Sequence, residues 1–195
     1  MGENILVLDL ETKSLFEDHA ERRPEVLGVS VVGTYCYRSD TYRVYDEKEI
    51  GALEERLSDK PLVVGFNIRR FDMPVLRPYL HFDPAILPML DILEILHNQL
   101  GHRVSLQSVA EATLGAGKSG SGLDAVAYYR AGDFDSLRRY CEDDVKVTRA
   151  VYEYGAAHGE LFFTSKFGNG KRRAPVTWKI VHPASENTTE QFSLF

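Results

Sequence analysis

Cysteine is scarce in this chain of 195 residues, which contains only Cys36 and Cys141. The two lie far apart and lack the paired spacing of a zinc site, and they are too few for the disulfide framework of a small secreted domain. We therefore expect neither a disulfide-rich protein nor a zinc protein. A reducing compartment suits such a sequence, so we expect a cytoplasmic protein.

Long apolar runs and an excess of positive charge are lacking as well. The apolar run Ile5–Leu8 stops at Asp9 and has no basic region before it, so we expect no signal peptide. No stretch approaches the roughly 18 apolar residues of a transmembrane helix, so no membrane association is expected. The formal net charge is −6, whereas proteins that coat duplex nucleic acid are basic. A nuclease stays compatible with this charge, because divalent cations bound by carboxylates attract phosphate.

The composition and the hydrophobic pattern indicate a globular α/β domain. Hydrophobic residues make up 44% of the chain and charged residues 27%, as in ordinary globular proteins. Strands are predicted at four apolar or alternating segments: Ile5–Leu10, Val26–Tyr37, Asp40–Tyr45 and Pro61–Phe66. Helices are predicted at six segments: Asp46–Leu57, Phe71–Leu80, Asp91–Leu100, Ser105–Leu114, Leu123–Arg130 and Phe134–His158. Three strands, a helix, a strand and several helices predict a mixed sheet flanked by helices.

The pattern changes after Gly159. Two strands are predicted at Leu161–Lys166 and Ala174–Val181, joined by a basic turn, Phe167–Arg173. We therefore expect a domain over residues 1–158, a small C-terminal β extension over residues 159–182 and a flexible polar tail over residues 183–195. Two roles stay open for the extension, which are a wider substrate groove and contact with a partner.

Four acidic residues stand at positions where a metal site could form. Asp9 and Glu11 are two residues apart at the end of the first strand, so both side chains lie on one face of the sheet. Buried carboxylates need compensation, which a divalent metal provides; alternatively, the strand ends at Asp9 and both acids are solvated. Asp72 follows the fourth strand, where a helix cap explains it equally well. Asp144 lies one helical turn after Tyr140; singly, they read as a solvated acid and a core aromatic.

Three motifs occur in a specific order along the chain. They are Asp-Leu-Glu-Thr at residues 9–12, Asn-Ile-Arg-Arg-Phe-Asp at residues 67–72 and Tyr-Cys-Glu-Asp-Asp at residues 140–144. Together they resemble the ribonuclease-H-like superfamily of 3′–5′ exonucleases, which includes polymerase proofreading domains, and specifically its DEDDy branch. The resemblance spans about residues 4–157. The sister branch has a histidine five residues before the last aspartate, where this chain has Arg139, whereas Tyr140 stands at the position of the tyrosine branch.

The resemblance implies a metal site and its chemistry. Asp9, Glu11, Asp72 and Asp144 would be the ligands of two divalent cations, Mg²⁺ or Mn²⁺, since hard oxygen ligands suit these ions. Tyr140 would orient the attacking water; a free tyrosine has a pKa of about 10, so hydrogen bonding is expected of it more than full general-base action. The product would be nucleoside 5′-monophosphates released from the 3′ end.

Substrate contacts are implied more weakly. By the same resemblance, the pocket for the terminal nucleotide would be lined by Leu10, Thr12, Asn67 and Phe71. Packing alone also explains Leu10 and Phe71. Arg69, Arg70 and Arg77 could approach the phosphate backbone, and a solvated basic face is an equal alternative.

The last five residues, Gln191-Phe192-Ser193-Leu194-Phe195, resemble the short peptide by which bacterial replication and repair proteins bind the sliding clamp. Gln191, Leu194 and Phe195 would make the contacts, with two apolar anchors entering a pocket. The alternative is a tail that folds back onto its own domain. A clamp partner favours DNA as substrate, with single-stranded or frayed 3′ ends processed in replication proofreading or repair. Two other functions stay open: RNA 3′-end trimming, and a non-catalytic nucleic-acid-binding adaptor.

Overall fold

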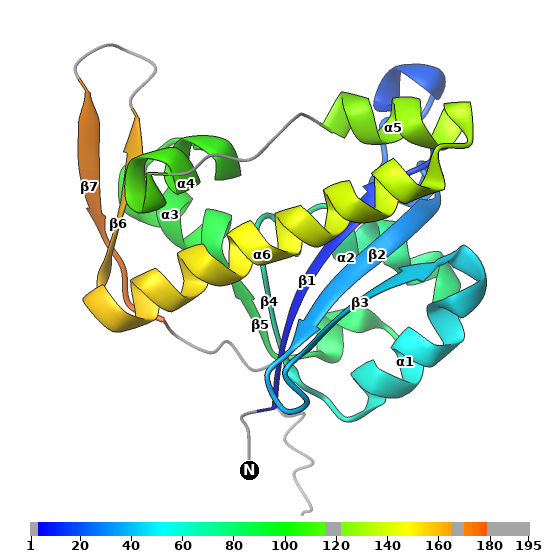
Figure 1. Cartoon of the computed structure of the whole chain (residues 1–195), viewed down its shortest axis with the longest axis horizontal. Helices are drawn as coiled ribbons and strands as arrows, with labels where there is room; N and C mark the ends of the chain where they lie inside the picture. Colours follow the sequence, from blue (N-terminus) through cyan, green and yellow to red (C-terminus); the bar gives the residue numbers. More distant parts are fainter. Residues whose placement is uncertain (1–3, 116–121, 165–169, 179–195) are drawn as a thin grey trace, which may run out of the picture.

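A five-stranded mixed sheet forms the centre of the molecule (Figure 1). The computed structural model describes residues 4–115, 122–164 and 170–178. Its strands are β1 (Ile5–Thr12), β2 (Val29–Cys36), β3 (Thr41–Asp46), β4 (Leu62–Gly65) and β5 (Met89–Asp91), in the spatial order β3-β2-β1-β4-β5. β1 runs antiparallel to β2 and parallel to β4, so the mixed sheet predicted from the sequence is confirmed.

Helices cover both faces of this sheet. α1 (Ile50–Ser58) and α2 (Asp72–Leu76) pack on one face; α3 (Ile92–Leu100), α4 (Leu106–Leu114), α5 (Gly122–Ala131) and α6 (Phe134–His158) lie on the other (Figure 1). Short 3₁₀ helices connect these elements at Phe16–Asp18, Pro24–Val26, Glu47–Glu49, Arg77–Tyr79 and Pro84–Ile86. No helix formed by the described residues is both long enough and apolar enough to cross a bilayer.

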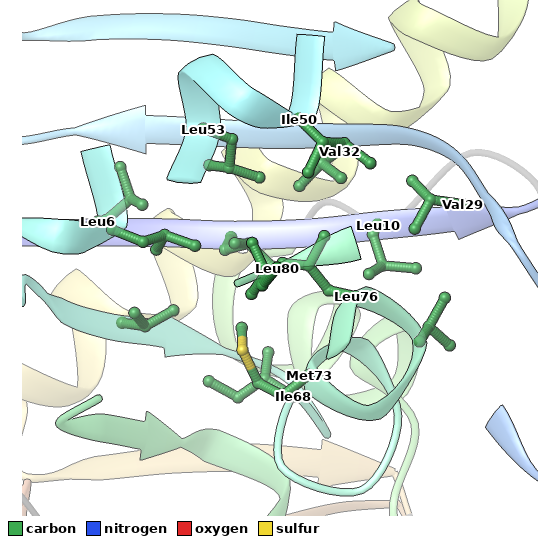
Figure 2. Packing of buried hydrophobic residues seen from close by; sticks show 14 of the residues in the cluster. Leu6, Leu10, Val29, Val32, Ile50, Leu53, Ile68, Met73, Leu76 and Leu80 are labelled. Atoms are coloured by element: carbon green, nitrogen blue, oxygen red, sulfur yellow. The ribbon is translucent and has the colours of Figure 1, made fainter. Parts of the chain in front are cut away.

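The alternation of side chains along β1 divides the core into two layers. Leu6, Leu8 and Leu10 are buried with side chains of α1 and α2, and Figure 2 shows Leu6 and Leu10 beside Leu53 and Leu76. Burying one such leucine stabilises the fold by about 1.5–3 kcal/mol. The intervening residues face α3 and α6, so the same alternation directs Asp9 and Glu11 toward α6.

A separate hairpin follows α6. Its strands are β6 (Glu160–Thr164) and β7 (Lys171–Pro175), which pair antiparallel beside α4 (Figure 1). The small C-terminal β extension predicted from the sequence is therefore present, but its second strand begins at Lys171 and not at Ala174. The prediction that Lys171–Arg173 belong to the turn is wrong: they are strand residues, because a charged sequence is compatible with an exposed edge strand.

Two other bounds differ from expectation. β1 continues to Thr12, two residues beyond the predicted end, so Asp9 and Glu11 lie within a paired strand. β5 was not predicted at all, since Met89–Asp91 is only three residues long. β5 pairs in parallel with β4, and this pairing between distant segments defines it as a strand.

Candidate active site

Two acidic side chains project from the middle of the sheet. In β1, Asp9 pairs with Gly33 of β2 and Glu11 pairs with Val31, so both belong to the regular ladder. The alternative that the strand ends at Asp9 and leaves both acids solvated is therefore wrong. Glu11 is only 8% exposed, and a carboxylate so deeply buried requires compensation.

A glycine opposite Asp9 lets α6 approach this point of the sheet closely. A Cβ atom on Gly33 would lie 2.8 Å from Cγ2 of Val145 and 2.9 Å from Sγ of Cys141. Any larger residue would push α6 away from β1 and β2. The close approach places the buried face of α6, which carries Tyr140 and Asp144, directly over the acids of β1.

Asp9, Glu11 and Asp144 form one carboxylate cluster. A ligand oxygen of each lies within 4.8 Å of the others, and Asp144 is only 3% exposed. Burial raises the pKa of the Cys141 thiol well above its usual value, and the nearby negative charges of all three acids raise it further. Three hard oxygen donors without a histidine or thiolate suit Mg²⁺ or Mn²⁺ and do not suit zinc. The cluster therefore fits a divalent cation.

Asp72, the fourth expected ligand, lies beside this cluster and not within it. Its Oδ1 accepts a hydrogen bond of 3.1 Å from the backbone N–H of Leu10, the residue between Asp9 and Glu11. Burial raises the pKa of Asp72 to about 7, and the nearby charge of Asp91 acts in the same direction. The capping alternative is not what the structure shows, because Asp72 is the first residue of α2 and Phe71 occupies the cap position.

Tyr140 lies on the same buried face of α6 as Asp144, one turn away. Its ring packs with Val31, Ala125 and Leu137 and is 7% exposed. The structure thus brings the tyrosine to the α6 side of the sheet, where the carboxylates meet.

A hollow of about 310 Å³ adjoins Glu11. Glu11, Thr12 and Phe71 line it, so two of the four expected substrate residues lie here. Its other walls include Phe16, whose ring contacts that of Phe71 edge-on at 6.2 Å, and Leu123, which is 64% exposed. Neither Phe16 nor Leu123 was predicted from the sequence; a leucine at the first position of a predicted helix was the available signal for Leu123.

The other two expected substrate residues have different surroundings. The Leu10 side chain is buried among leucines of the core, and only its backbone N–H points to Asp72. Asn67 adopts a left-handed backbone conformation, with φ of 73°, where a turn follows β4. Its N–H donates to Asp91 Oδ1 at 2.8 Å, and its side-chain oxygen accepts from Arg103 at 2.8 Å. It lines a second, smaller hollow.

Asp91 holds the turn that leads to Asp72. Its carboxylate caps α3 by accepting from the N–H of Glu94 and also accepts from the N–H groups of Asn67 and Arg69. One buried side chain therefore fixes the first turn of α3 and the turn after β4 together.

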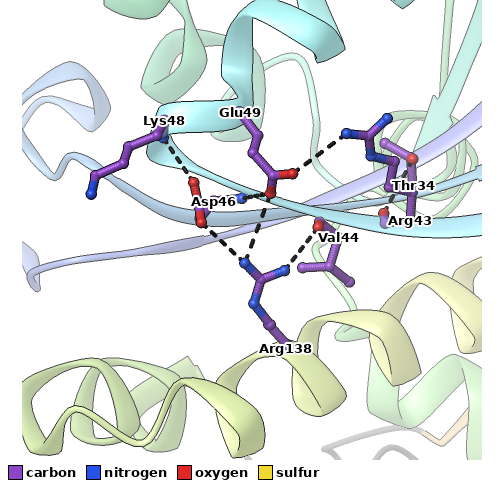
Figure 3. Close-up of polar contacts among 7 residues, drawn as sticks. All are labelled: Thr34, Arg43, Val44, Asp46, Lys48, Glu49 and Arg138. Carbon is purple, nitrogen blue, oxygen red and sulfur yellow. Dashed lines mark hydrogen bonds and ion pairs between the residues drawn. The ribbon is translucent and has the colours of Figure 1, made fainter.

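Arg138 fixes the first half of α6 against the sheet edge. Its guanidinium donates to the carbonyl of Val44 at 3.0 Å and to Asp46 at 3.1 Å, and it lies 3.8 Å from Glu49 (Figure 3). Tyr140 and Asp144 follow on the same helix, so this contact holds the register of the residues above the acids.

The expected clamp-binding residues Gln191, Leu194 and Phe195 lie outside the described part of the chain. So do residues 179–182 of the β extension and Ser165 and Lys166 of its first predicted strand.

The comparison with curated proteins gave no match. A family model of the RNase H superfamily matches residues 6–155, which include all four acids, Tyr140 and the central sheet except Ile5. This match and the buried acidic cluster fit a metal-dependent nuclease. The match covers well over half of the sequence, and the chain belongs to the RNase H superfamily.

Proposed function

We propose that the protein is a 3′–5′ exonuclease of the tyrosine (DEDDy) branch, acting on single-stranded or frayed 3′ ends of DNA. The observation that carries the proposal is the convergence of Asp9, Glu11 and Asp144 within 4.8 Å of one another beside Asp72. Carboxylates gathered in this way suit cation-assisted phosphodiester hydrolysis.

In the proposed mechanism, the four acidic side chains bind cations and Tyr140 positions water. Asp9, Glu11 and Asp144 would hold the cations, and Asp72, the first residue of α2, would complete the set. Two bound Mg²⁺ or Mn²⁺ ions supply activation of water and neutralisation of phosphate charge. Tyr140 orients the attacking water through its hydroxyl group. The water oxygen bonds to phosphorus, the bond to the 3′ oxygen breaks, and that oxygen takes up a proton. A nucleoside 5′-monophosphate leaves.

The hollow beside Glu11 supports the proposal of action at an end. Its volume of about 310 Å³ is at the lower end of the range for small-ligand pockets. Phe16 and Phe71 offer ring surfaces on which a terminal base can stack, and Thr12 offers a polar atom that could bind the sugar.

Two alternatives are distinguished by substrate and by activity. An RNA-trimming enzyme would use the same site and would degrade a 3′ RNA end faster than the matched DNA end. A non-catalytic adaptor would bind both and hydrolyse neither. The terminal peptide Gln191–Phe195 favours DNA, because the proteins it resembles work on DNA.

The decisive experiment compares two neighbouring aspartates of α6. Asp144→Asn removes a clustered carboxylate and should reduce Mn²⁺-dependent mononucleotide release by on the order of a thousandfold, since such interactions supply several kcal/mol to the transition state. Asp143→Asn alters an exposed acid paired with Lys146 and should leave the rate unchanged. The substrates are 5′-labelled DNA and RNA of equal sequence. Full activity of Asp144→Asn, or cleavage of circular single strands, contradicts the proposal.

A further inference from the structure

Basic residues without acidic partners gather between the candidate active site and the C-terminal hairpin. In this region Arg69 pairs with Glu94 and Arg173 pairs with Glu160. Four further cations form no ion pair with any residue that the structure describes: Arg70, Arg103, Lys171 and Arg172. We call these four the basic track. In a chain of net charge −6, such a local surplus of positive charge needs an explanation.

The near end of the track adjoins the site. Arg70 and Arg103 line the same small hollow, of about 30 Å³, and Arg103 donates to the side-chain oxygen of Asn67 at 2.8 Å. Arg70 immediately precedes Phe71, a wall of the hollow beside Glu11. A strand whose end occupies that hollow would therefore pass the turn that carries Arg70, and Arg103 bonds to Asn67 in the same turn.

The far end lies on the hairpin, and the loop after α3 joins the two ends. The ring of His102 contacts the ring of Phe163 in β6 edge-on at 5.8 Å, while the next residue, Arg103, reaches Asn67. On the hairpin, Arg172 pairs with Phe163 and therefore lies on the same face as the His102 contact. Lys171 projects from the other face of the exposed strand β7, where its ammonium group lies 4.2 Å from the ring centre of Phe162. Cations beside an aromatic ring are the combination that binds the phosphates and bases of single strands.

The hairpin is fixed to α4, so its cations have defined positions. The hydroxyl of Thr113 donates to the carbonyl of Phe162 and accepts from its N–H, both at 2.9 Å. Ser108 makes the same pair of bonds to Thr164, at 3.2 and 3.0 Å. Two hydroxyl groups thus take the place of a neighbouring strand along the edge of β6. Figure 1 shows the hairpin standing beside α4 at one end of the molecule.

We propose that the basic track binds the phosphates of the single strand upstream of the nucleotide being removed, guiding it from the hairpin to the carboxylate cluster. The proposal rests on the proposed function for the identity of the site at its near end. The hairpin lies beyond residue 155, the end of the family match, so it adds a binding surface to the superfamily domain.

The test measures binding without hydrolysis. In an Asp144→Asn background, fluorescence anisotropy gives the affinities of a trinucleotide and of an oligonucleotide of about 12 nucleotides, within the site sizes of single-strand grooves. Lys171→Gln with Arg172→Gln removes two cations of the track. Arg38→Gln with Lys60→Gln is a control with the same change of charge: it removes two cations from the opposite end of the sheet, where β1 begins, one of them paired with Asp59.

The hairpin variant should reduce the preference for the long oligonucleotide by about tenfold. It should also lower the slope of log K against log salt by about 1.4, since each phosphate contact on a single strand contributes about 0.7. The control should change neither quantity. An unchanged preference, an unchanged salt slope, or an equal loss in the control overturns the proposal.

Failure of the track and failure of the exonuclease proposal give different results. If the hairpin variant loses its preference while the wild-type protein hydrolyses no substrate, the track stands and the exonuclease proposal fails. If the wild-type protein degrades 3′ ends and the hairpin variant keeps its preference for long strands, the exonuclease proposal stands and the track fails.

Discussion

Asp9, Glu11 and Asp144 are placed where their charges oppose folding. Their ligand oxygens approach within 4.8 Å, and Glu11 and Asp144 are buried, so their mutual repulsion is weakly screened without a cation. Active sites of this kind commonly sacrifice stability for function.

A stability measurement follows from this repulsion. In EDTA, Asp144→Asn should stabilise the protein by about 1 kcal/mol or more, which raises Tm by about 2–4 °C per kcal/mol for a chain of this size. Mn²⁺ should raise the Tm of the wild-type protein and have much less effect on the variant. Thermal melts with and without metal provide the measurement. A variant that melts below the wild-type protein in EDTA would show that the carboxylates do not repel.

Tyr140 can be separated from the metal ligands by one hydroxyl group. Tyr140→Phe keeps the ring that packs on Val31 and Ala125, so folding should be preserved. Mononucleotide release should fall about tenfold to a hundredfold, at the lower end of what a positioned proton-handling group contributes. The rise in Tm on adding Mn²⁺ should equal that of the wild-type protein. If the rate is unchanged, Tyr140 is a core aromatic and nothing more.

At the residue scale, the order of the three sequence motifs predicted the metal ligands better than the position of any single residue did. Asp9, Glu11 and Asp144 meet as expected, because strand alternation and helix periodicity fix which side chains share a face. Phe16 was missed as a wall of the hollow, since its position depends on a ring contact with Phe71, 55 residues away in the chain. Pairing over such a separation leaves no local pattern.

At the element scale, predictability followed the strength of local signals. α6 was predicted with its observed bounds, Phe134–His158, because Asp133 caps its first turn and Gly159 ends it in the left-handed conformation. β5 was not predicted, since a three-residue strand is defined by its pairing with β4. β7 was placed three residues late because a run of three basic residues is more typical of a turn.

Asp91 joins two elements, and its removal should affect both. Asp91→Ala removes the cap of α3 and leaves the N–H groups of Asn67 and Arg69 without their acceptor. The expected loss is about 2–4 kcal/mol of unfolding free energy, from one cap and two partly buried donors. Urea denaturation measures it.

Asp83 provides the control for this experiment. It caps the 3₁₀ helix Pro84–Ile86 through the N–H of Ala85, and its side chain is largely exposed. Asp83→Ala should therefore cost about 1 kcal/mol or less. Equal losses for the two variants would mean that Asp91 acts only as a cap and does not fix the turn before Asp72.

At the scale of the whole molecule, the distribution of charge matters more than its sum. The net charge of −6 argued against broad duplex binding, and the structure brings three carboxylates together in one cluster. The basic track lies on the side that leads to the hairpin. No sequence average could show this separation, because Arg70, Arg103 and Lys171 come from three distant segments.

A protein without a broadly basic surface benefits from a second attachment to DNA. We propose that Gln191, Leu194 and Phe195 bind a bacterial sliding clamp. Two linked binding sites raise the effective concentration of the nuclease at its substrate without tighter binding to the phosphates of DNA. This attachment should matter on clamp-loaded DNA and should have no effect on free oligonucleotides.

Deleting residues 191–195 should therefore abolish clamp binding in surface plasmon resonance and leave the hydrolysis of free oligonucleotides at the wild-type rate. Leu194→Ala with Phe195→Ala should have the same effect, because apolar anchors commonly contribute most of the affinity of a short peptide. Ser193→Ala, between the proposed contacts, is the matched control and should bind normally. If the truncated protein still binds the clamp with wild-type affinity, the attachment lies elsewhere and the peptide has another role.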